Sequence, residues 1–279
     1  MSIKMIALDM DRTTLDAEGR LSEETKAALE YAIAKDVHIV IASGRSFSAL
    51  PTDVMAVEGI EYAITCNGAE VYYIPEKKCL RSFCLSEEAV EAVMELTKDA
   101  SVTYEGFIRG QAYAAREYVS DPVRFGAGEK VVDYVQRTRV AKEDIRGFLL
   151  AHKQELNSMD IIVKDPLEKQ RIWELLCREV PDVYITSSVA QLIEISDKRG
   201  GKHSGVKCVA EVLGIRQEEI AAFGDADNDI DMLLYAGVGV AVENASENCL
   251  KAADMIVPHH DKDGVAKGIY QLLKEGPLQ

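Results

Sequence analysis

Short apolar runs alternate with amphipathic segments over the first part of the chain. The apolar runs lie at 5–8, 37–42 and 62–65. Runs of this length without polar alternation are typical of strands that are buried on both faces. The segments between them, at 22–33 and 46–57, have the apolar spacing and the initial serine of helices. Strands and helices in this order predict a right-handed, doubly wound parallel sheet.

The pattern changes after residue 70. Two strand-like runs around Pro75 predict a hairpin, and a serine at 86 predicts the start of a helix. Further strands are predicted at 102–108, 111–115, 159–163, 183–186 and 191–195, and a helix follows Pro166. The stretch 117–146 has no clear period. This middle part predicts an α+β domain with a mostly antiparallel sheet.

The doubly wound order resumes with a helix at 202–213 and a strand at 220–223. Further strands are predicted at 238–242 and 255–257, and further helices at 230–235, 246–252 and 264–273. We therefore predict an α/β fold. Residues 1–83 and 194–279 would form a Rossmann-like core with a parallel sheet, and 84–193 an inserted α+β cap domain.

Composition restricts the class of protein. The chain has 279 residues and a formal net charge of -15, so neither nucleic acid nor an anionic membrane is an expected partner. No apolar stretch reaches the length of a membrane span, and the first apolar run is too soon interrupted by acids to be a leader. The six cysteines form no Cys-x-x-Cys motif, and we expect buried, reduced thiols in a soluble cytoplasmic protein.

Two carboxylates follow the first strand directly. Asp9 and Asp11 are one residue apart, and ligands of parallel sheets collect beyond the carboxyl ends of the strands. Two acids at such an edge are costly unless a cation binds between them, which indicates a divalent metal ion. A calcium loop is excluded, because Thr14 stands where that loop needs glycine and Arg20 where it needs glutamate.

Other polar residues occur at the same predicted edge. Ser43 ends the second strand, Lys202 begins the helix after the insertion, and Asp225, Asn228 and Asp229 follow a later strand. Each has an ordinary explanation by itself: Ser43 as a helix N-cap, Lys202 as a surface lysine, the acids as favourable charges at a helix start. Their common position predicts a single site.

These motifs resemble those of the haloacid dehalogenase superfamily of phosphohydrolases, in its Cof-type subclass IIB. Residues 9–13 read Asp-Met-Asp-Arg-Thr, and 43–45 read Ser-Gly-Arg. Lys202 follows the insertion, and 224–232 read Gly-Asp-Ala-Asp-Asn-Asp-Ile-Asp-Met. The family has a glycine where this chain has Arg12.

The resemblance implies a mechanism and a role for each residue. Asp9 would attack phosphorus and form an aspartyl-phosphate, and Asp11 would act as general acid and base. Mg²⁺ would bind to Asp9, the backbone carbonyl of Asp11 and Asp225, with Asp229 orienting these ligands. The phosphoryl oxygens would be held by Ser43, Gly44, Lys202 and Asn228. The substrate would be a small phosphorylated metabolite such as a sugar phosphate, selected by the cap.

Three other functions remain alternatives. A phosphomutase would keep the fold and rebind its intermediate. A receiver-type protein uses a similar acid cluster but would not need an inserted domain. A sensor that binds a phosphorylated ligand without turnover is supported only by Arg12, which we expect to lie in an ordinary turn and point to solvent. The alternative is that Arg12 reaches the site and binds a second anionic group.

The run His259-His260-Asp261 resembles a metal cluster. Adjacent side chains in a loop usually diverge, so we expect a solvated loop there.

Overall fold

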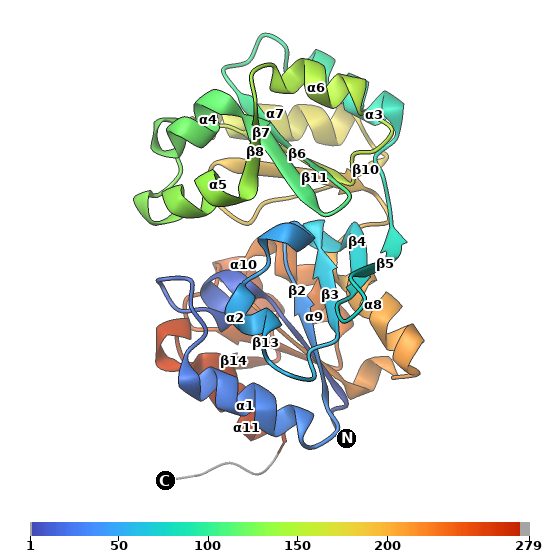
Figure 1. Ribbon diagram of the computed structural model, residues 1–279, viewed down its shortest axis with the longest axis vertical. Coiled ribbons are helices and arrows are strands. Elements are labelled where there is room, and N and C mark those ends of the chain that lie inside the picture. The colour runs from blue at the N-terminus through green and yellow to red at the C-terminus, as the bar shows by residue number, and fades with distance from the viewer. Residues whose placement is uncertain (1, 274–279) are drawn as a thin grey trace. The chain divides into compact units, whose positions relative to one another are not determined.

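The computed structural model describes residues 2–273 and divides the chain into two compact units (Figure 1). The first unit comprises Met1–Arg45, Leu50–Arg81 and Gly201–Gln279. The second unit comprises Ser46–Ala49 and Ser82–Gly200. The second unit is thus mainly one continuous insertion into the first.

The first unit contains an eight-stranded sheet in the order β14-β13-β12-β1-β2-β3-β4-β5. Its strands are β1 (Met5–Leu8), β2 (His38–Ala42), β3 (Tyr62–Thr65), β4 (Glu70–Tyr73), β5 (Lys78–Ser82), β12 (Ile220–Gly224), β13 (Val238–Val242) and β14 (Met255–Val257). The six strands from β14 to β3 are parallel, and β3 pairs with β4 antiparallel. The apolar strand β1 lies between β12 and β2 with all four residues buried. The predicted doubly wound fold class is confirmed.

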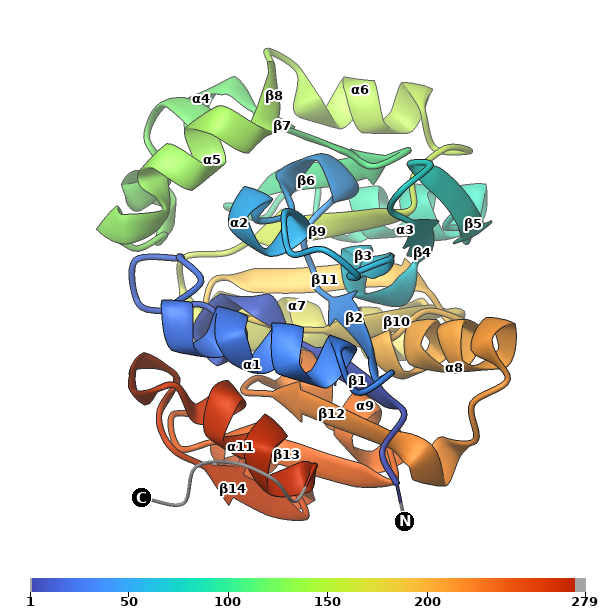
Figure 2. The same cartoon turned by 60° about the horizontal axis from the view of Figure 1, so that its bottom comes forward.

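Helices cover both faces of this sheet. They are α1 (Glu23–Ile33), α2 (Thr52–Met55), α8 (Lys202–Leu213), α9 (Ile230–Tyr235), α10 (Glu247–Ala252) and α11 (Gly264–Leu272). Figures 1 and 2 both show α1 beside α11, whereas α8, α9 and α10 pack with the strands in a separate apolar cluster. Helix α1 begins where predicted, because the Ser22 hydroxyl accepts a hydrogen bond from the Thr25 amide at 3.0 Å.

The second unit contains a six-stranded sheet in the order β10-β11-β9-β6-β7-β8. Its strands are β6 (Thr103–Ile108), β7 (Gln111–Ala115), β8 (Arg139–Lys142), β9 (Ser158–Ile162), β10 (Val183–Thr186) and β11 (Leu192–Asp197). Its helices are α3 (Glu87–Leu96), α4 (Arg116–Ser120), α5 (Val132–Thr138), α6 (Ile145–Ala151) and α7 (Pro166–Glu179). All pairings are antiparallel except β7 with β8, which confirms the mostly antiparallel prediction.

The helix predicted at 46–57 is wrong. Only a 3-10 turn, Phe47–Ala49, and the short helix α2 occur there. Pro51 lacks an amide hydrogen and disfavours the helical conformation for the residue before it, so the two pieces cannot join. The first piece belongs to the second unit, where the Ser48 amide donates to the Gly110 carbonyl at 2.9 Å.

The junctions between the units also differ from the predicted ones. The chain enters the second unit after Arg81, two residues before the predicted junction at 83/84, and leaves it after Gly200, not at 193/194. The second predicted junction would cut β11, whose residues Leu192–Ser196 pair with β9. The sheet partners of this strand therefore set the junction.

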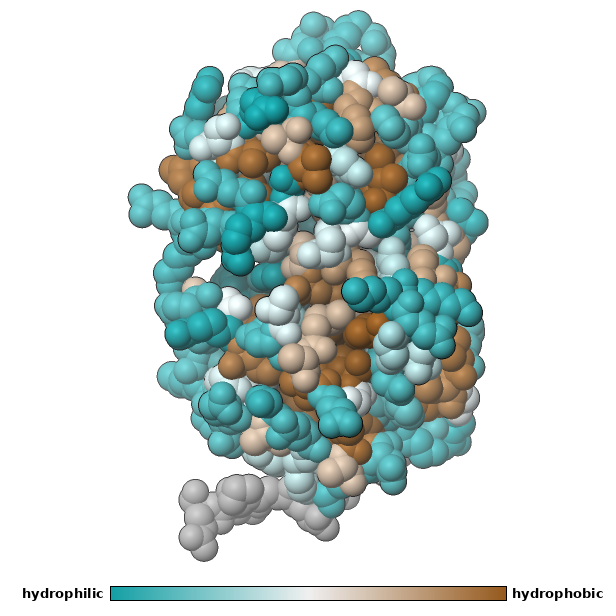
Figure 3. All heavy atoms as spheres, in the orientation of Figure 1, coloured by the Kyte–Doolittle hydropathy of each residue, from teal (hydrophilic) through white to brown (hydrophobic). Residues whose placement is uncertain are grey.

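The surface agrees with the charge-rich composition. Hydrophilic side chains cover much of the face drawn in Figure 3, with apolar ones between them. Among residues 2–273, no helix combines the length and apolar composition that a membrane crossing requires.

The six cysteines are free, but the prediction of burial holds only for Cys66 and Cys249, while Cys79 and Cys177 are exposed.

Candidate active site

Asp9 lies directly beyond the carboxyl end of β1, and its backbone is fixed from both sides. Its amide donates to the Phe223 carbonyl at 3.0 Å, and its carbonyl accepts from the Thr14 hydroxyl at 2.6 Å. The residue is buried, with 6% of its surface exposed. The side chain of Asp9 therefore has a defined position at the sheet edge where ligands of parallel sheets bind.

Lys202 joins Asp9 to a second carboxylate. Its ammonium group donates to Asp9 Oδ1 and to Asp229 Oδ1, each at 2.6 Å. The lysine side chain is completely buried, so the alternative of an ordinary surface lysine is excluded. An unpaired ammonium at such a position would be costly, and the two carboxylates compensate for its burial.

The start of α8 holds Lys202 in place against the turn Cys66–Gly68. Gly68 has a φ of 88°, and a Cβ atom there would lie 2.0 Å from the Gly201 carbonyl oxygen. The Arg81 guanidinium donates to the carbonyls of Ser204 at 2.8 Å and Gly68 at 3.1 Å. Only glycine permits this close approach of the two backbones.

Asp229 organises the loop that follows β12. Its Oδ2 accepts from the amides of Asp225 at 3.0 Å and Ala226 at 3.1 Å. With Oδ1 bound to Lys202, both oxygens of Asp229 are engaged. Asp225 Oδ1 accepts a hydrogen bond from the Thr13 hydroxyl at 3.2 Å. Asp229 thus orients Lys202 and the backbone of Asp225 and Ala226.

Burial dominates the protonation of this cluster. It raises the pKa of Asp9 well above its ordinary value, and Lys202 opposes the shift while Asp229 adds to it. Burial and the neighbouring Asp229 raise the pKa of Asp225 to about 7, although Arg12 and Lys202 oppose this. For Lys202, burial favours the neutral form, but Asp229 and Asp9 outweigh it, so its pKa lies above the ordinary value.

The carboxylates fit a divalent cation. Oxygen atoms of Asp9, Asp225 and Asp229 lie within 4.8 Å of one another, and all three residues are buried. A hard cation prefers such an all-oxygen set, and its charge would stabilise the ionised forms that burial disfavours. Because both oxygens of Asp229 are engaged, Asp9 and Asp225 are the side chains that fit direct contact with the ion.

A pH dependence of stability follows from Asp225. Its pKa is about 7 in the folded protein and about 4 in an unfolded chain, so the folded state holds the proton more tightly. In the metal-free protein, Asp225 therefore contributes less to the free energy of unfolding as the pH rises from about 4 to about 7. We expect Asp225→Asn to show a smaller fall in Tm between about pH 5 and pH 8, measured in EDTA by differential scanning calorimetry.

Asp227→Asn is the matched control for this measurement, because Asp227 lies in the same loop but is exposed. Its pH dependence should follow that of the wild type. Equal pH dependence of the wild type and Asp225→Asn would contradict the raised pKa.

Ser43 directly follows β2, and Asn228 lies in the turn after β12, as predicted. The buried Ser43 hydroxyl accepts from the Arg45 amide at 3.1 Å, and Gly44 between them is half-buried. Asn228 Nδ2 donates to Asn67 Oδ1 at 2.9 Å, and its own Oδ1 is buried without a hydrogen-bond partner among residues 2–273. Asn67 connects the two, since its amide donates to the Ser43 carbonyl at 3.2 Å.

Asp11 does not join the buried cluster through its side chain. It is paired with Arg45, whose Nε donates to Asp11 Oδ2 at 2.8 Å and whose Nη2 donates to Asp11 Oδ1 at 2.5 Å. The Asp11 side chain is 55% exposed, whereas that of Arg45 is only 14% exposed. Two parallel bonds of this kind are a strong and specific arrangement. No pattern in the sequence indicates that Arg45 is the partner of Asp11.

Arg12 contradicts the prediction of an ordinary turn. Its φ is 61° and its ψ is 12°, the left-handed conformation that favours glycine. Its Nε lies 3.8 Å from Asp225 Oδ2, although 60% of the side chain is exposed. Arg12 therefore has a backbone conformation that glycine adopts more easily, and it adds a positive charge beside the site.

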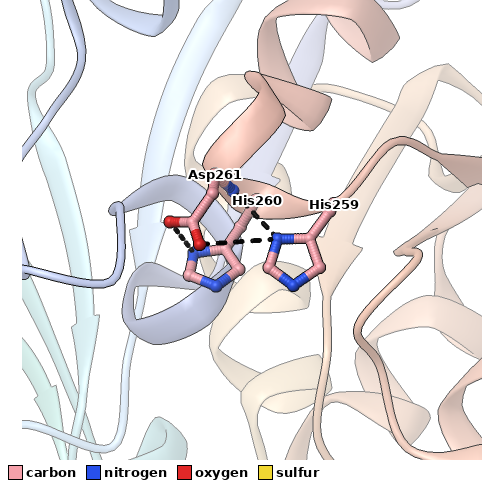
Figure 4. A group of neighbouring side chains, drawn as sticks. All are labelled: His259, His260 and Asp261. Atoms are coloured by element: carbon pink, nitrogen blue, oxygen red, sulfur yellow. Dashed lines mark hydrogen bonds and ion pairs between the residues drawn. The ribbon is translucent and has the colours of Figure 1, made fainter.

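His259, His260 and Asp261 converge instead of diverging, so that prediction is also wrong (Figure 4). The two imidazole rings stack with centroids 4.6 Å apart. His260 Nδ1 lies 2.8 Å from the Leu15 carbonyl, and Asp261 Oδ1 accepts from the Ala17 amide at 2.8 Å. These bonds hold the loop after β1, which gives the cluster a structural role.

Comparison with known proteins shows which family this chain resembles. A model of the haloacid dehalogenase-like hydrolase family matches residues 6–269. The putative phosphatase YxeH of Bacillus subtilis is 26% identical over 274 residues, which cover 97% of this chain and 98% of that protein. Phosphatase YwpJ of the same organism is 28% identical, with 97% and 100% covered.

Solved structures show the same fold. A haloacid dehalogenase-like hydrolase from B. subtilis has a TM-score of 0.83 and 25% identity, with 97% of this chain and all of the other covered. The subclass IIB sugar phosphatase BT4131 has a TM-score of 0.78 and 24% identity, with 96% and 98% covered. The buried acids around Lys202, the inserted unit and the family match lead to one assignment: this chain belongs to the haloacid dehalogenase-like hydrolases.

Proposed function

We propose that this protein is a Mg²⁺-dependent phosphatase that hydrolyses small phosphomonoesters through an aspartyl-phosphate at Asp9. The observation that supports this most is the position of Asp9. It lies at the carboxyl end of the central strand, bonded to Lys202 and close to the Asp225 and Asp229 carboxylates. A nucleophilic carboxylate needs this combination of a fixed position and nearby positive charge.

Asp9 would act as the nucleophile. Its Oδ1 is held by Lys202, which leaves Oδ2 for attack on phosphorus. The bond from phosphorus to the alcohol oxygen breaks as the bond to Asp9 forms, and water then releases inorganic phosphate from the aspartyl-phosphate. When Mg²⁺ is bound, it neutralises charge on the carboxylates and on the phosphoryl oxygens.

Asp11 would move the protons. It would protonate the leaving alcohol oxygen in the first step and take a proton from the attacking water in the second. The exposed position of its side chain allows it to reach a substrate oxygen, while the two hydrogen bonds from Arg45 orient the carboxyl group. The backbone carbonyl of Asp11, together with Asp9 and Asp225, would complete the protein ligands of Mg²⁺.

The phosphoryl oxygens would be held by donors around Asp9. Ser43 can donate its hydroxyl hydrogen, since within residues 2–273 its Oγ accepts a bond from the Arg45 amide and donates none. Gly44, Lys202 and Asn228 would add a backbone amide, the ammonium group and the side-chain amide. Such fixed donors stabilise the charge that develops on the transferring group.

Names of relatives support a small metabolite as the substrate. One solved neighbour is a sugar phosphatase, and another relative, YcsE of B. subtilis, is named a 5-amino-6-(5-phospho-D-ribitylamino)uracil phosphatase. The net charge of -15 argues against nucleic acid and anionic membranes as substrates or partners. We propose that the second unit selects among small phosphorylated metabolites in the cytoplasm.

A panel of phosphorylated metabolites tests this proposal. After EDTA treatment and desalting, the protein should release inorganic phosphate from at least one sugar phosphate when Mg²⁺ is added, and none without it. Ca²⁺ should not replace Mg²⁺, because it prefers more ligands at longer distances and would draw Asp9 away from its line of attack.

Full phosphate release in EDTA would contradict the metal requirement. Conversion of one sugar phosphate into an isomer without phosphate release would indicate the phosphomutase instead. Binding of a phosphorylated ligand with no turnover of any compound would favour the sensor.

A further inference from the structure

Arg12 lies beside the proposed metal site but is not one of its proposed ligands. It follows Asp11 in a left-handed conformation, with a φ of 61°. A residue with a Cβ adopts this conformation at an energetic cost, because the Cβ crowds the backbone. Contacts with the surrounding structure must therefore hold Arg12 in this conformation.

Two polar contacts hold this turn. Asn244 Nδ2 donates to the Arg12 carbonyl at 2.8 Å, and Asn244 Oδ1 accepts from the His260 amide at 3.0 Å. The loop that contains His260 is in turn fastened to the Leu15 carbonyl. The backbone of Arg12 is thus fixed by residues that are more than 200 positions away in the sequence.

The side chain extends from this fixed backbone to Asp225. Arg12 Nε lies 3.8 Å from Asp225 Oδ2, the outer limit of an ion pair, and no hydrogen bond between the two side chains occurs in the described chain. Asp225 is buried, but 60% of the Arg12 side chain is exposed. The contact is therefore loose, and the guanidinium remains accessible from solvent.

We propose that Arg12 is a resident cation that balances the charge of Asp225 in the free protein, competes there with Mg²⁺, and strengthens binding of the phosphoryl group. The proposal rests on the proposed function, in which Asp225 is a metal ligand. A fixed positive charge close to a cation site lowers the affinity for the cation, and the same charge attracts a phosphate dianion. Metal and phosphate binding are then coupled, because phosphate neutralises the charge that opposes the metal.

The decisive experiment is a titration of metal-free protein with MgCl₂ by isothermal titration calorimetry, without substrate. Arg12→Asn removes the charge and keeps a residue that tolerates the left-handed conformation. Its Mg²⁺ dissociation constant should fall on the order of three- to tenfold relative to the wild type, the range that one screened charge gives. Arg12→Lys retains the charge and should stay close to the wild type.

Arg216→Gln is the matched control. Arg216 is an exposed arginine paired with Glu219 ahead of β12, so the variant makes the same change in net charge away from the site. Its Mg²⁺ affinity should equal that of the wild type. With Mg²⁺ saturating, inorganic phosphate should bind more weakly to Arg12→Asn than to the wild type or Arg216→Gln.

The outcomes separate this proposal from the proposed function. Tighter Mg²⁺ binding by Arg12→Asn alone supports it, and damage to the fold would not produce such a gain. Equal Mg²⁺ affinity of the wild type and Arg12→Asn, or weaker binding by Arg12→Asn, overturns the role of Arg12 and leaves the metal site intact. Absence of Mg²⁺ binding in every variant overturns the metal site itself, and the role of Arg12 with it.

Discussion

Asp9→Asn is expected to abolish phosphate release while leaving the protein folded. An amide can neither attack phosphorus nor contribute negative charge to a metal site, so kcat should fall by at least about 10³-fold. The fold should persist, because the substitution removes a buried charge whose ionisation is already unfavourable, and Lys202 retains Asp229 as a partner. Phosphate release under saturating Mg²⁺ and the circular dichroism spectrum are the two measurements.

Asp227→Asn provides the control for the same chemical change. Asp227 is exposed in the loop after β12, where its Oδ1 accepts from the Ser246 hydroxyl at 2.7 Å. This variant should keep kcat within a few-fold of the wild type. A folded Asp9→Asn protein with near-normal kcat would show that Asp9 is not the nucleophile.

Lys202→Met should affect both stability and activity. The ammonium group is the shared partner of Asp9 and Asp229, and its removal leaves two buried carboxylates without a counter-charge. Breaking a buried ion pair in this way costs about 3–5 kcal/mol. The free energy of unfolding in urea should fall by that order, and phosphate release should fall by orders of magnitude.

A second substitution separates the two effects. Lys202→Met combined with Asp229→Asn removes one of the unpaired carboxylates, so stability should recover in part while activity does not. Lys207→Met is the control, because Lys207 is exposed on the same helix. A Lys202→Met protein as stable and as active as Lys207→Met would refute the role of this lysine.

The parts of the fold that the sequence predicts well have clear local patterns. The buried strand β1 and the capped helix α1 are examples, because an apolar run and an N-cap serine can both be recognised in the local sequence. The stretch 117–146 has no such local pattern. It contains the short helices α4 and α5 and the half-exposed strand β8, whose parallel pairing with β7 depends on tertiary contacts.

In the site, too, some features could be predicted from the sequence and others could not. Residues at the ends of strands could be placed at one edge from the sequence, because the topology of a parallel sheet brings those ends together. Their partners could not, since the bonds of Arg45 to Asp11 and of Asn244 to Arg12 join residues 34 and 232 positions apart. Thr13 and Asn67 were missed as partners of Asp225 and Asn228 for the same reason.

Detection of the covalent intermediate tests the central claim most directly. Protein mixed with Mg²⁺ and its best substrate is quenched in acid within one turnover, digested and analysed by mass spectrometry. The proposed mechanism predicts a phosphoryl group on Asp9 that appears and decays at rates consistent with kcat and is missing from Asp9→Asn. Rapid phosphate release with no phosphoryl group on Asp9 at any quench time would contradict it.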